Sequence, residues 1–146
     1  MVMDKYQKFG QISGQVFIGA GFGIGAAILS IIIAGLYNDS LELLGIGVYG
    51  LIGFYIGNPI GIGYDGFKLL KKLGRQRDFY RFFIQSIIGT LLGIALLYYG
   101  PMTFGQSIPA GQVTRVLTTL LIIVLPLTGG TIGFNLGLPY TEKQDR

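Results

Sequence analysis

Apolar positions along the chain fall into four long runs, separated by shorter segments that contain most of the polar residues. The runs cover residues 12–37, 43–64, 79–99 and 116–136. A helix needs about 20 residues to cross the hydrocarbon core of a bilayer, and each run has that length or slightly more. An open strand in lipid would leave backbone polar groups unpaired, so the pattern predicts four transmembrane helices.

The first two runs resemble the last two at an offset of 70 residues. Six of 21 positions are identical in the first arm and four of 21 in the second, comparing 9–29 with 79–99 and 46–66 with 116–136. Abundant glycine and isoleucine raise both numbers. The same offset nevertheless places Gln15 on Gln85 and Asp65 on Asn135. Because membrane transporters are commonly built by duplication, with the working site between the halves, we interpret the match as an internal repeat.

These observations predict an all-α membrane protein whose four transmembrane helices form two parallel-repeat helical hairpins with glycine-rich packing. The first hairpin occupies residues 1–66, a basic linker follows over 67–78, and the second hairpin with a short polar tail occupies 79–146. Glycines recur every four residues in all four runs, for example Gly19 and Gly23. That spacing puts small residues on one helical face, where backbones can approach closely.

Charge placement predicts the orientation. Basic residues crowd the central linker and its flanks, at Lys68, Lys71, Lys72, Arg75, Arg77 and Arg81. The segments between the runs of each hairpin hold Asp39, Glu42 and only Arg115 as a basic residue. The positive-inside rule therefore places both termini and the linker in the cytoplasm, in a multi-pass integral membrane protein. The basic residues are also candidates for contact with anionic lipid or a partner protein, whereas a basic surface that abuts the bilayer does not favour nucleic acid.

Two of the apolar runs contain a proline, Pro59 and Pro126, at nearly corresponding positions of the repeat. Proline removes one backbone donor and crowds the preceding turn, so we expect each helix to kink or unwind there. Paired interruptions in two halves are typical of a substrate or ion site. Polar side chains at similar depth, Gln15, Gln85, Asn58 and Thr128, are candidates to line a path in one layer. The alternative is that these groups only join helices by hydrogen bonds.

Composition excludes several classes of chemistry. The chain is 51% hydrophobic and 12% charged, and it contains neither cysteine nor histidine. Without these residues or an intramembrane carboxylate, acid-base and nucleophilic catalysis have no candidates, so we expect a non-enzyme that uses no metal or cofactor. A small channel or carrier for an ion or polar solute is the leading hypothesis. The alternative is a non-catalytic subunit or assembly factor of a larger membrane complex, and either is expected to form homo-oligomers or bind partner proteins.

Overall fold

The computed structural model describes residues 5–37, 43–104, 112–136 and 138. Four α-helices account for nearly all of them: α1 (Lys5–Tyr37), α2 (Leu43–Lys72), α3 (Phe79–Phe104) and α4 (Gln112–Asn135). A short 3-10 helix, η1 (Gln76–Asp78), precedes α3. The described part of the chain contains no strand, which confirms the all-helical prediction.

Three helices are long and apolar enough to cross a membrane, over Phe9–Tyr37, Gly45–Lys72 and Gln76–Leu97. α4 carries a shorter apolar stretch, Leu120–Asn135. Two helices are longer than the predicted runs: α1 begins at Lys5 rather than at residue 12, and α2 ends at Lys72 rather than at residue 64. The described helices are therefore compatible with a membrane protein.

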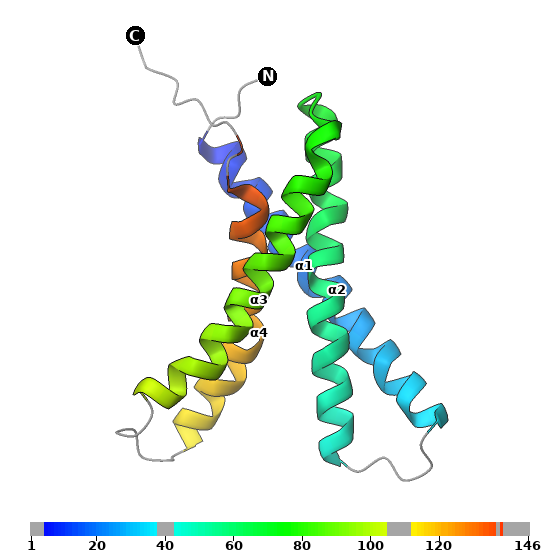
Figure 1. Ribbon diagram of the computed structural model, residues 1–146, viewed down its shortest axis with the longest axis vertical. Helices are drawn as coiled ribbons and strands as arrows, with labels where there is room; N and C mark the ends of the chain where they lie inside the picture. The colour runs from blue at the N-terminus through cyan, green and yellow to red at the C-terminus, as the bar shows by residue number, and fades with distance from the viewer. Residues whose placement is uncertain (1–4, 38–42, 105–111, 137, 139–146) are drawn as a thin grey trace.

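The helices form two antiparallel hairpins that meet along part of their length (Figure 1). α1 packs along α2 and α3 along α4, and the hairpins touch through α2 with α3 and α4 and through α1 with α4. The start of α1, the α2–α3 turn and the end of α4 lie at one end, called here the linker end. Toward the opposite end the hairpins separate widely, and it is called the diverging end.

Close backbone contact at glycines holds each hairpin together. A methyl group added at Gly57 would collide with the backbone carbonyl of Phe22 in α1. In the second hairpin, a methyl group at Gly89 would collide with the carbonyl of Gly129, and one at Gly129 would collide with that of Gly89. Any side chain at these positions would push the helices apart, so the four-residue glycine spacing serves packing within each hairpin.

The turn between the hairpins is short and sharply defined. Gly74 has a φ of 70°, the left-handed conformation that favours glycine. The N–H of Gly74 donates to the carbonyl of Lys71 at 3.2 Å, and the N–H of Arg75 donates to that of Leu70 at 2.8 Å. This pair of bonds is a Schellman motif, which ends α2. The structure thus places residues up to Lys72, predicted as linker, in the last turns of α2.

A compact apolar core lies toward the linker end. Leu70 and Phe82 are buried there with Phe134, whose ring covers Gly66 so closely that no side chain would fit at that position. Leu69, Ile62, Leu127 and Leu138 complete the cluster. Elsewhere large apolar side chains are exposed on every helix, including Phe17 at 78% and Leu36 at 77%. An apolar exterior of this kind suits lipid contact.

Substituting Gly89 by alanine tests the glycine contacts. The added methyl group meets the carbonyl of Gly129, so we expect Gly89→Ala to lower the free energy of unfolding by about 1 to 3 kcal/mol. Gly21→Ala is the matched control, because nothing lies within 4 Å of a methyl group there. Unfolding in detergent micelles by increasing SDS, followed by circular dichroism, measures both variants. Equal stability of the two would contradict the assignment.

Candidate functional site

A row of polar side chains follows the contact between the hairpins. On α2, Tyr55, Asn58, Ile62 and Asp65 are spaced by three or four residues and share one helical face. With their neighbours on α1 and α4 they form what we call the polar seam, made up of Gln11, Gln15, Tyr55, Asn58, Asp65, Thr131 and Asn135. Ile62 is the apolar member of the same α2 face.

At the linker end, two glutamines of α1 make hydrogen bonds, one to α2 of the same hairpin and one to α4 of the other hairpin. Gln11 Nε2 donates to Asp65 Oδ2 of α2 at 2.7 Å, and one helical turn later Gln15 Oε1 accepts from Asn135 Nδ2 of α4 at 2.5 Å. Asn135 Nδ2 also donates to the Thr131 carbonyl at 2.8 Å. Asp65 and Asn135 are the pair superposed by the offset of 70 residues. α1 is therefore hydrogen-bonded both to α2 of its own hairpin and to α4 of the second hairpin.

Asn58 lies deeper in the seam and is fully buried. Its Oδ1 would be only 2.9 Å from a methyl group on Gly19 of α1, and Leu127 of α4 touches the same point at 3.2 Å. Neither amide atom of Asn58 has a hydrogen-bond partner, and Gln15 Nε2 also lacks one. Burying an amide without partners costs free energy, and these atoms retain unused hydrogen-bonding capacity.

Ile62 fills the centre of the hairpin contact. It is completely buried, with Cγ1 2.8 Å from the methyl position of Gly19 and Cδ1 3.0 Å from that of Gly130. On the Gly130 side lie Thr90, which donates to the Ser86 carbonyl at 3.0 Å, and Ser86 itself. The Ser86 hydroxyl is buried without a partner. Unpartnered polar atoms thus occur on both hairpins near one apolar side chain.

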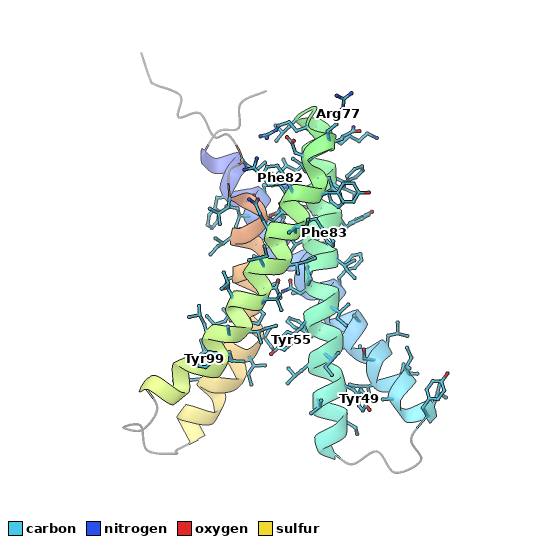
Figure 2. The ribbon with its side chains drawn as sticks, viewed as in Figure 1. Tyr49, Tyr55, Arg77, Phe82, Phe83 and Tyr99 are labelled. Atoms are coloured by element: carbon cyan, nitrogen blue, oxygen red, sulfur yellow. The ribbon has the colours of Figure 1, made fainter. Side chains whose placement is uncertain are left out.

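Neither helix unwinds at its proline. α2 is α-helical through Pro59 and α4 through Pro126, and both prolines are buried. Pro126 has no N–H to bond the carbonyl four residues earlier, which belongs to Ile122. The Tyr55 hydroxyl of α2 donates to that carbonyl at 3.4 Å, and Figure 2 shows Tyr55 on the side of α2 that faces the second hairpin. The neighbouring hairpin therefore offers this carbonyl a partner through a long hydrogen bond, and α4 stays α-helical through Pro126.

The four residues predicted to share one polar layer differ in their hydrogen bonding. Gln15 and Asn58 belong to the seam, whereas Gln85 is half-buried on α3, with its Oε1 buried and unpartnered and no hydrogen bond to Gln15. Thr128 donates to the carbonyls of Val124 and Leu125 in its own helix, at 2.7 and 3.1 Å. The layer is thus not joined by hydrogen bonds among its predicted members.

Several polar residues in or beside the seam were not predicted from the sequence. Tyr55, Ser86, Thr90 and Thr131 were not singled out, and Asn135 was noted only as the counterpart of Asp65. The spacing of Ser86 and Thr90 by four, one residue after Gln85, was the available signal. The contact of Tyr55 with a carbonyl 67 residues away had no local signal.

The basic residues gather at the linker end, where Figure 2 shows Arg77 at the tip of the molecule. Arg75 Nε pairs with Asp78 Oδ2 at 2.7 Å, and its guanidinium lies over the ring of Phe82. Lys68 Nζ lies 4.3 Å from the centre of the Tyr64 ring. Lys71, Lys72, Arg77 and Arg81 are exposed. Among the described residues, no group of three acidic side chains could hold a metal ion.

Comparison with known protein families, curated proteins and solved structures finds no match to this chain.

A double-mutant cycle tests whether the Tyr55 hydroxyl serves the Ile122 carbonyl. Tyr55→Phe leaves the Ile122 carbonyl without a partner, so we expect a loss of about 1 to 2 kcal/mol in the free energy of unfolding. Pro126→Ala supplies a backbone N–H for the same carbonyl, and Tyr55→Phe should then cost clearly less. Unfolding of the four proteins of this double-mutant cycle measures the difference. Equal cost in both backgrounds would show that the hydroxyl does not serve that carbonyl.

Proposed function

We propose that the chain is a four-span membrane protein and that it works as a small channel or carrier, with the polar seam as its path. The observation that carries this proposal is the fully buried Asn58 amide, which has no partner at either atom. In a hydrocarbon setting such an amide is costly, and buried polar groups of this kind mark solute or ion paths. Gln15, Gln85, Thr128, Pro59 and Pro126 remain path candidates, since they lie on the helices that border the seam.

Duplication supports the location of the path between the hairpins. In the first hairpin, Gly57 approaches Phe22. Adding 70 to that pair gives residues 92 and 127, and the close pair of Gly93 and Leu125 in the second hairpin lies within two residues of those positions. The close contact between the two helices therefore falls at nearly corresponding positions in the two hairpins. Transporters built from repeats place their sites at such a repeat interface.

The proposed orientation puts the linker end in the cytoplasm. The exposed cations of that end, Lys68, Lys71, Lys72, Arg77 and Arg81, suit the anionic lipid of the inner leaflet, with each charge near the surface contributing about 1 kcal/mol. Arg75 contributes less to lipid binding, because it is already paired with Asp78.

Single cysteines test this orientation directly, because the chain has none of its own. We expect Gln76→Cys, at the linker end, to be protected from a membrane-impermeant maleimide added outside intact cells. Ser107→Cys, in the segment between the third and fourth runs, should react. Permeabilised cells, in which both cysteines should be labelled, are the control. The reverse pattern in intact cells would overturn the orientation.

Flux through purified protein tests the path. In liposomes, the protein should increase the flux of at least one of water, urea, glycerol and K⁺ above that of empty vesicles. Asn58→Leu should lower this flux about tenfold or more, because it removes the unpartnered amide. Ile56→Leu is the matched control, since Ile56 lies two residues from Asn58 on the same helix with 58% of its surface exposed and is not part of the seam. Absence of flux for every solute would refute the proposal.

The second candidate function is a structural subunit, and it is favoured by glycines that make no close contact with the described part of the chain. Gly10, Gly14, Gly21 and Gly25 of α1 have nothing within 4 Å of an added methyl group, so their face is free for another helix. Purification distinguishes the two functions: a stable larger complex without flux in liposomes favours the subunit.

A further inference from the structure

The free polar atoms of the hairpin contact belong to neutral groups that both donate and accept hydrogen bonds. Asn58 offers an amide N–H and a carbonyl oxygen, Gln15 offers N–H groups, and Ser86 offers a hydroxyl. No charged residue occurs in the sequence between residues 9 and 38 or between 43 and 64. Asp65, at the linker end of the seam, already accepts from Gln11.

A desolvated ion would find poor compensation here. A cation needs several oxygens around it, whereas the Nδ2 of Asn58 and the Nε2 of Gln15 bring positively polarised hydrogens to the seam. An anion would need cationic partners, and the described basic residues between Lys68 and Arg81 lie at the linker end. A neutral molecule with both donors and acceptors would satisfy the amide and the hydroxyl without any charge to compensate.

Ile62 limits the size of that molecule. Its side chain fills the space between Gly19 and Gly130 and is completely buried. On α2, Asn58 lies one turn from Ile62 toward the diverging end. On α1, Gln15 lies one turn from Gly19 toward the linker end and is bonded to Asn135. An apolar side chain with polar groups on either side is the arrangement of a hydrophobic constriction.

From this geometry we propose that the seam admits a small neutral hydrogen-bonding molecule, of the size of water or urea, and that Ile62 is the apolar barrier it must pass. The inference rests on the proposed transport function and specifies its substrate class. Ile62 acts by filling space, so its truncation should increase flux, whereas removal of the Asn58 amide should decrease flux.

The experiment compares Ile62→Ala with Ile60→Ala in liposomes of neutral lipid. Ile60 is the matched control, because it lies two residues away on the same helix with 47% of its surface exposed. Stopped-flow light scattering measures water and urea flux, and a K⁺-sensitive dye inside the vesicles measures ion flux. We expect Ile62→Ala to raise water or urea flux about tenfold, the effect of lowering a barrier by about 1.4 kcal/mol. Ile60→Ala should match the unmodified protein, and none should pass K⁺.

The outcomes separate the inference from the function on which it rests. Flux of K⁺ that exceeds flux of water and urea would overturn the substrate class and leave a transport function standing. Unchanged water and urea flux in folded Ile62→Ala, with measurable flux in the unmodified protein, would overturn the barrier. Absence of all flux from both proteins would refute the transport function itself. If Ile62→Ala does not fold by circular dichroism and size exclusion, Ile62→Val takes its place, and the same outcomes apply to a smaller increase.

Discussion

Direct contact between helix backbones is the constraint on which this structure depends. Where lipid surrounds the helices, apolar side chains gain little by leaving lipid for a neighbouring helix, so association relies on close packing. Gly57, Gly89 and Gly129 provide that contact by letting a carbonyl of the facing helix occupy the place of a side chain. Each hairpin is therefore fixed by its own backbone, and the contact between the hairpins is left to larger side chains such as Ile62 and Phe134 and to a few polar bonds. The polar seam belongs to this side-chain contact between the hairpins.

The sequence predicted the helices well because the length and polarity of each run report directly on secondary structure. The extension of α2 to Lys72 was missed, because Leu69 and Leu70 stand among lysines and their burial against Phe82 is a tertiary contact. The continuous helix at each proline was not predicted for a related reason. Proline lowers helical stability locally, but the Tyr55 hydroxyl that serves the freed carbonyl comes from another hairpin and leaves no trace in the sequence near Pro126.

The sequence indicated which polar side chains are buried, but not which hydrogen-bond partners they have. Gln15 and Asn58 were recognisable as polar residues inside apolar runs, and both are fully buried. The position of each residue along its apolar run does not indicate whether its side chain finds hydrogen-bond partners. Gln15 bonds Asn135 through one atom, Asn58 bonds nothing, and Thr128 bonds its own helix. These differences depend on the rotation of each helix about its own axis, which the sequence does not specify.

The left-handed turn at Gly74 has a mechanical consequence. Two hydrogen bonds fix the chain at this turn, and the apolar core is gathered beside it, so a rotation of the hairpins about this turn would have its pivot at the linker end. α2 is 30 residues long, which corresponds to an arm of about 45 Å. A rotation of about 5° at the pivot moves the far tip of such an arm by about 4 Å, more than the diameter of a water molecule. Because Ile62 lies only ten residues from the pivot end of this arm, the same rotation shifts it by little more than 1 Å. A rotation about this turn would therefore displace the diverging end of α2 widely and Ile62 only slightly.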